Sequence, residues 1–96
     1  MRVRVGVIGV GNMGSAHCKW LENHPQMVLT AVADVIEARR GRWAADPSVQ
    51  VFDSGQALIR SGVCAAVIVA TPPFSHVASA SAALKAGLHV MVEKPI

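Results

Sequence analysis

The sequence predicts an α/β protein with a doubly wound parallel sheet, and three observations carry this prediction. Apolar segments rich in β-branched residues recur along the 96 residues, and segments of helical periodicity separate them. The expected strands are apolar almost throughout, which indicates burial on both faces, as in a parallel sheet. A glycine-rich turn, at Gly9, Gly11 and Gly14, joins the first expected strand to the first expected helix.

The expected elements alternate along the whole chain. Strands are expected at residues 3–10, 27–33, 49–52, 65–70 and 89–92. Helices are expected at residues 12–23, 36–45, 56–61 and 75–86. This alternation is typical of a parallel sheet built from right-handed crossovers. Doubly wound folds of this type usually have six strands, so we expect the chain to be a fragment that lacks the sixth.

Prolines and glycines mark the expected helix ends. Pro25 and Pro47 end the first two helices, because the residue before a proline resists the helical conformation. Gly62 and Gly87 supply the left-handed residue that commonly ends a helix. Ser75 is expected to cap the start of the fourth helix.

Two helices show apolar residues at helical spacing, and we expect these faces to pack on the sheet. In the first helix the face consists of Met13, Ala16, Trp20 and Leu21. In the fourth helix it consists of Val77, Ala80, Ala83 and Leu84.

The glycine-rich turn has the spacing G-x-G-x-x-G between a predicted strand and a predicted helix. In that context Gly9 permits the turn, Gly11 leaves room for a pyrophosphate beside the backbone, and Gly14 lets the helix pack closely on the strand. Backbone N–H groups at the helix start then face the phosphates, helped by the positive end of the helix dipole. The stretch therefore predicts a dinucleotide-binding site.

Asp34 closes the second predicted strand, about 20 residues after Gly14. A carboxylate there accepts hydrogen bonds from the adenosine ribose and repels a 2′-phosphate, which predicts NAD as the preferred cofactor. The structural alternative is that Asp34 caps the second helix. Arg39 and Arg40 leave NADP possible, because a guanidinium can bind a 2′-phosphate or stack on adenine. Their structural alternative is a solvated helix face.

Two further motifs follow predicted strands, at the edge where open parallel sheets bind ligands. Thr71 and Pro72 end the fourth strand, and His76 lies in the first turn of the next helix, where a structural role is the alternative. Glu93 and Lys94 follow the fifth strand. A lysine there would lie near a bound nicotinamide, which suits proton transfer or a hydrogen bond to a substrate oxygen. The alternative is a surface lysine at a strand end.

Composition excludes several classes of function. With 52% hydrophobic and 16% charged residues the chain is globular. The net charge is only +3 and no aromatic residues interleave with the arginines near residue 40, so nucleic-acid binding is not expected. Neither a membrane span nor a signal peptide is recognisable, so we expect a cytoplasmic location, with Cys18 and Cys64 as reduced, buried thiols. No pair of histidines has metal-ligand spacing, and no metal site is expected.

Together, these motifs resemble those of the Gfo/Idh/MocA family, named for glucose–fructose oxidoreductase and inositol dehydrogenase. The glycine motif extends to His17, the Thr-Pro-Pro motif extends from Thr71 to His76, and Glu93-Lys94-Pro95 follows the fifth strand. This combination is more specific than the glycine motif alone, and it covers essentially the whole chain.

The resemblance implies an NAD(P)-dependent oxidoreductase that moves a hydride between nicotinamide and a carbon bearing a hydroxyl, typically of a sugar or polyol. It implies that Lys94 lies beside nicotinamide and substrate as a catalytic residue, and that Glu93 lines the cofactor site. The residues that would hold the pyrophosphate are Gly9, Gly11, Asn12 and Met13.

The resemblance also implies a second, mostly β domain that shapes the substrate pocket, completes proton transfer and forms a homo-oligomer interface. The 96 residues are then the Rossmann dinucleotide-binding domain alone, and we expect them to bind NAD weakly and not to turn over. The alternative is a non-catalytic dinucleotide-binding sensor or assembly module. A longer reading frame rich in strands favours the enzyme, and a stop codon after Ile96 favours the module.

Overall fold

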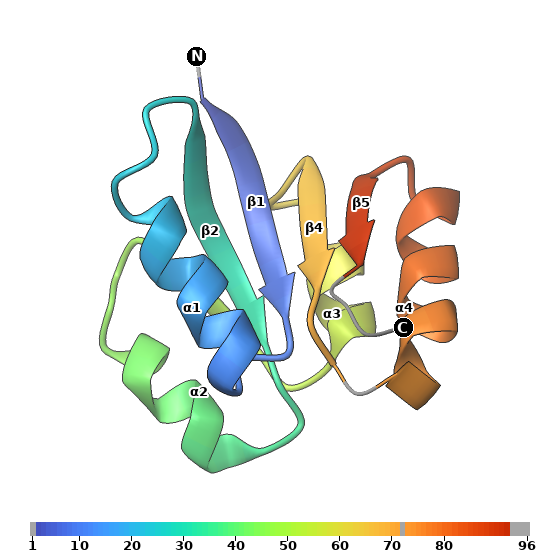
Figure 1. Ribbon diagram of the computed structural model, residues 1–96, viewed down its shortest axis with the longest axis horizontal. Coiled ribbons are helices and arrows are strands. Elements are labelled where there is room, and N and C mark those ends of the chain that lie inside the picture. Colours follow the sequence, from blue (N-terminus) through green and yellow to red (C-terminus); the bar gives the residue numbers. More distant parts are fainter. Residues whose placement is uncertain (1, 72, 93–96) are drawn as a thin grey trace.

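Strands and helices alternate along the chain, and the strands lie side by side in one sheet (Figure 1). The computed structural model describes residues 2–71 and 73–92, with side chains for all of these except residues 12, 13 and 73–77. The elements are β1 (Val3–Ile8), α1 (Asn12–Leu21), β2 (Met27–Ala33), α2 (Glu37–Ala44), β3 (Gln50–Phe52), α3 (Gly55–Ser61), β4 (Ala66–Val69), α4 (Pro73–Lys85) and β5 (His89–Val92).

The sheet confirms the predicted doubly wound architecture. Its strands are all parallel, in the order β3-β2-β1-β4-β5. Helices α1 and α2 lie on one face, and α3 and α4 lie on the other (Figure 1). The register pairs Ile8 with Ala33 on one side and with Val69 on the other, so the carboxyl ends of the three central strands are level.

Two apolar layers bury the sheet between them. Leu21 of α1 and Trp43 of α2 pack in the layer on one face. Leu58 of α3 and Ala83 of α4 pack in the layer on the other. Burial on both sides explains why the strand sequences show no alternation of apolar and polar residues.

The predicted inner face of α1 is partly wrong. Cys18 and Leu21 are buried, whereas Ala16 is exposed and Trp20 is 55% exposed. Helix α1 carries two apolar stripes, and spacing alone does not say which one meets the sheet. Tight packing of its first turn against β1 sets the rotation of the helix and turns Trp20 away from the buried layer.

The start and the predicted face of α4 also differ from expectation. The helix begins at Pro73, so Ser75 lies within it and is not its cap. Proline suits the first turn of a helix, because its missing N–H would have no partner there. Ala83 is buried as predicted, but Leu84 is 64% exposed, and the side chain of Val77 lies outside the described residues.

Glycine ends two helices as predicted. Gly62 after α3 has a φ of 73°, and Gly87 after α4 has a φ of 82°, both in the left-handed region.

None of the helices in the described part of the chain has the length and apolar character needed to cross a membrane.

Both cysteines are buried free thiols, as predicted. Burial raises the pKa of Cys18 from 9.0 to about 12. Burial also raises the pKa of Cys64. Because the thiolate is the reactive form, both side chains should be inert at neutral pH.

We expect dithionitrobenzoate to modify neither thiol at pH 8 until denaturant is added. The pKa of Cys18 is higher in the folded protein, at about 12, than the ordinary value of 9.0 that it has when unfolded. The protonated thiol therefore stabilises the fold fully below pH 9.0, and this stability is lost as the pH rises toward 12. The melting temperature should therefore fall across that alkaline range, and a Cys18→Ser control should flatten the fall. Rapid labelling of the native protein at pH 8 would contradict this account.

Candidate dinucleotide-binding site

The loops after β1, β2 and β4 meet at the carboxyl edge of the sheet, the lower edge in Figure 1. The backbone N–H of Gly9 donates to the carbonyl of Ala33 at 2.7 Å, and that of Ala70 donates to the carbonyl of Ile8 at 2.8 Å. These bonds extend the strand pairing into the loops. The glycine turn, the Asp34 loop and the Thr71 loop therefore meet at one edge, whereas Glu93 and Lys94, which we expected there too, lie outside the described residues.

The three motif glycines are needed for different reasons. Gly9 has a φ of 92°, and a Cβ there would lie 2.9 Å from the carbonyl carbon of Ala70. A Cβ on Gly14 would collide with the carbonyl of Gly9. A Cβ on Gly11 would meet only the guanidinium of Arg39, at 3.4 Å. The fold thus requires Gly9 and Gly14, whereas Gly11 is bordered by the flexible Arg39 side chain, which can move aside when a ligand approaches the backbone.

The start of α1 has no side chain that caps it. Gly11 is the N-cap residue, and the first turn contains no acidic residue. The N–H of Ser15 donates to the Gly11 carbonyl at 2.8 Å, which is an intrahelical hydrogen bond of the first turn. Earlier N–H groups of a helix have no intrahelical acceptor, and they carry the positive end of the dipole. The turn therefore suits an anionic group such as a phosphate.

Asp34 links the glycine turn to the end of β2. Asp34 is only 8% exposed, and its carboxylate accepts two backbone hydrogen bonds, from Val10 at 2.9 Å and from Ile36 at 2.8 Å. The alternative that Asp34 is the N-cap of α2 is wrong, because Ile36 occupies that position. A carboxylate has about four acceptor positions, so capacity remains for ribose hydroxyls.

Arg39 and Arg40 point to different places. The Nη1 atom of Arg39 lies 3.9 Å from Oδ2 of Asp34, and this side chain is half exposed. Arg40 instead lines a separate hollow beside Phe52 and Asp53. Arg39 is thus an exposed side chain that also lies beside Asp34, and so exposed an ion pair contributes little to stability.

A groove of about 420 Å³ runs along this edge. Val35 and Ile36, which are 80% and 44% exposed, form an apolar wall beside Asp34. Neither residue was among those expected at the site, although the sequence has this apolar pair directly between Asp34 and the predicted helix. The residues that line the groove are Ile8, Gly9, Ala33, Asp34, Val35, Ile36, Arg39, Gly55, Ala70, Thr71 and Ser79.

Several predicted site residues lie outside the described part of the chain. Pro72, Glu93 and Lys94 do so entirely. The side chains of Asn12, Met13 and His76 do so as well, although their backbones belong to α1 and α4. Within the described residues, no group of three or more His, Cys, Asp or Glu side chains could hold a metal ion.

The residues that are described fit a dinucleotide. The glycine turn offers N–H groups at a helix start whose N-cap residue has no side chain, Asp34 offers a carboxylate, and Val35 with Ile36 offers an apolar wall for a flat base. Fold and site together define a Rossmann-type dinucleotide-binding domain.

The chain belongs to the Gfo/Idh/MocA family. Residues 3–96 match the family described as an oxidoreductase family with an NAD-binding Rossmann fold. The expected family and its cofactor class are therefore confirmed.

Relatives with known functions are much longer than this chain. An inositol 2-dehydrogenase of Rubrobacter xylanophilus is 38% identical over 96 residues, which cover 99% of this chain and 28% of the relative. The crystal structure of a myo-inositol dehydrogenase from Lactobacillus casei, in complex with NAD(H) and myo-inositol, matches with a TM-score of 0.90 and 31% identity, over 99% of this chain and 29% of that one.

A second solved structure contains the other nicotinamide cofactor. KijD10, a 3-ketoreductase from Actinomadura kijaniata in complex with NADP, matches with a TM-score of 0.88 and 30% identity, over 99% of this chain and 31% of that one. The fold thus occurs with either cofactor, and the chain spans less than a third of the length of these relatives.

The glycines give a matched pair of substitutions. Gly14→Ala should unfold the domain, because its Cβ has no space beside Gly9. Gly11→Ala should lower the melting temperature by only about 5 °C, since alanine is a poorer N-cap than glycine by roughly 0.5–1 kcal/mol, yet weaken ADP-ribose binding about tenfold or more by blocking the close approach. Circular dichroism and calorimetric titration measure the two effects. Equal loss of stability in both variants would contradict these roles.

Proposed function

We propose that this chain is the cofactor-binding domain of a dehydrogenase that oxidises a hydroxyl of inositol or of a sugar-type substrate, with NAD preferred over NADP. The observation that carries the proposal is the meeting of the glycine turn, Asp34 and the Thr71 loop at one edge of the sheet. The substrate class is supported by the inositol dehydrogenases among the relatives.

The adenosine half of the cofactor is held by residues of the groove. The uncapped N–H groups at the start of α1 donate to the pyrophosphate beside Gly11, and the helix dipole favours its charge. Asp34 accepts hydrogen bonds from the ribose hydroxyls with the lone pairs that Val10 and Ile36 leave unused. Val35 packs against the adenine ring.

The nicotinamide half is proposed to reach the loops after β4 and β5. Thr71, which lines the groove beside Gly9, offers a hydroxyl to that half. Pro72, His76 and Glu93 are proposed from the sequence to line the same region, and Lys94 to hold or move a proton at the substrate oxygen. Bound NAD supplies the acceptor for the hydride.

The whole protein is proposed to be a cytoplasmic homo-oligomer in which a second domain completes the substrate pocket. Substrate orientation and exclusion of water need that domain. The 96 residues alone should therefore not turn over.

Asp34 sets the predicted preference between cofactors. Asp34→Ala removes the charge that repels a 2′-phosphate, so the ratio of NADPH to NADH affinity should rise about tenfold. The same change leaves two backbone N–H groups without acceptors and should cost about 2–4 kcal/mol of stability. Calorimetric titration of both cofactors measures the ratio. Asp53→Ala, an exposed carboxylate outside the groove, is the control, and an unchanged ratio for Asp34→Ala would remove Asp34 from the site.

Arg39 is expected to favour NADPH, whereas Asp34 is expected to favour NADH. Its guanidinium lies beside the Asp34 carboxylate and can turn toward a 2′-phosphate. Arg39→Ala should weaken NADPH binding about five- to tenfold and change NADH binding less than threefold. Arg42→Ala is the control, because that guanidinium lies over the Trp43 ring at 4.9 Å. Equal effects of Arg39→Ala on both cofactors would exclude such a role.

A further inference from the structure

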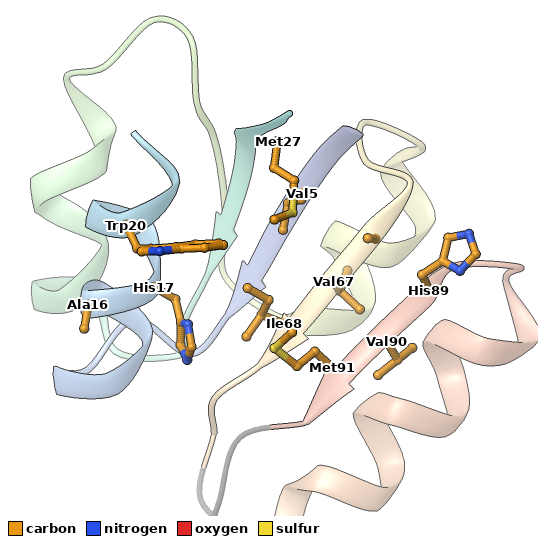
Figure 2. Close-up of a pocket in the computed structure, with 11 residues that line it drawn as sticks. Val5, Ala16, His17, Trp20, Met27, Val67, Ile68, His89, Val90 and Met91 are labelled. Atoms are coloured by element: carbon orange, nitrogen blue, oxygen red, sulfur yellow. The ribbon is translucent and has the colours of Figure 1, made fainter. Parts of the chain in front are cut away.

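Within the described part of the chain, one face of β4 and β5 has no helix over it. On the face covered by α1 and α2, these helices lie over β1, β2 and β3, while α3 and α4 lie on the opposite face (Figure 1). Beside α1, the surface of β4 and β5 forms a second groove, of about 570 Å³. Figure 2 shows this groove, with α1 on one side and β5 on the other.

The lining of the groove is apolar. Trp20 projects from α1 over the strands, and Met91 projects from β5 toward Ile68 (Figure 2). Trp20 is 55% exposed and Met91 is 57% exposed, although both are large hydrophobic side chains. Among the described residues that line it, the imidazoles of His17 and His89 and the indole N–H of Trp20 are the polar side-chain groups. Parallel sheets are normally covered on both faces, so a surface of this composition marks a docking site.

Sheet topology limits what can cover this surface. The crossovers from β3 to β4 and from β4 to β5 pass through α3 and α4, on the opposite face. A further parallel strand beside β5 would be reached by a crossover of the same right-handed sense. Its helix would also lie on the α3 and α4 face. Continuing the β-α-β pattern therefore leaves the groove uncovered.

We propose that the groove is filled by one amphipathic α-helix from the substrate domain of the full-length protein, so that this surface is the interface between the two domains. The inference rests on the proposed two-domain organisation. The inositol 2-dehydrogenase relative is more than three times as long as this chain, which covers 28% of it, so a large part of such a protein must pack elsewhere. The docking helix presents an apolar stripe to Trp20, Ile68 and Met91.

A second copy of this chain fits the surface less well. A symmetric dimer brings the same patch of both copies together. Two hollow surfaces placed face to face leave a void between them, and voids forfeit the packing contacts that make an interface stable. A single convex helix fills the groove.

This placement connects the two domains through α1. The helix that begins at the glycine turn also forms one wall of the groove (Figure 2). A domain docked there is held at a fixed position relative to the phosphate-binding end of α1.

Trp20 reports whether the groove is covered. The only other tryptophan, Trp43, is 4% exposed. In this chain acrylamide should quench Trp20, and in the product of the complete reading frame Trp20 should become as protected as Trp43. Equal quenching of Trp20 in the 96-residue chain and in the complete protein would overturn the proposal. Protection of Trp20 that increases with the concentration of the 96-residue chain would indicate a second copy and would also overturn the proposal. A reading frame that stops at Ile96 would do the same.

Charge substitutions test the same surface by stability. Trp20→Glu and Met91→Glu should lower the melting temperature of the complete protein by roughly 5 °C or more and leave that of the 96-residue chain nearly unchanged. Leu84→Glu, equally exposed but on α4, is the control and should have no effect at either length. Equal effects of the groove variants at both lengths would refute the interface. NADH titration of the same proteins tests the proposed function separately, because a covered groove does not require bound cofactor.

Discussion

The architecture depends on how closely α1 approaches the end of β1. Space for a side chain is missing between Gly14 and the carbonyl of Gly9, so helix and strand meet backbone to backbone. This contact fixes the rotation of α1, which buries Cys18 and Leu21 and leaves Trp20 at the surface. It also fixes the direction in which the first N–H groups of the helix point. The geometry of the glycine turn, where we propose that phosphate binds, and the exposed wall of the groove beside α1 therefore have one physical origin.

Asp34 gives the site its second fixed point. The sequence placed a carboxylate at the end of β2, and the structure adds that this carboxylate holds the glycine turn through the Val10 N–H. If Asp34 also binds the ribose, as we propose, the same carboxylate couples the shape of the turn to the chemistry of the ligand. The neighbouring Arg39 offsets its charge at the surface.

Most of the fold was predictable because strands buried on both faces and helix-ending glycines leave strong local signals. The bounds of β2 and β5 agree with the prediction to the residue. The faces of α1 and α4 were not fully predictable, since Ala16 and Leu84 are apolar but exposed. The meeting of Gly9, Asp34 and Thr71 at one edge followed from the parallel topology. The contact between Arg39 and Asp34 did not, because it depends on a side-chain conformation that no spacing rule predicts.

The central claim is that the loops after β1, β2 and β4 form one binding edge for the adenosine half of the cofactor. Titration of the ¹⁵N-labelled chain with ADP-ribose, followed by amide chemical shifts, tests it directly. The account predicts saturable shifts that are largest at Val10, Gly11 and Ile36 and negligible at Val90 and Met91 in the groove. Shifts centred on the groove between α1 and β5, or none at millimolar ligand, would contradict it.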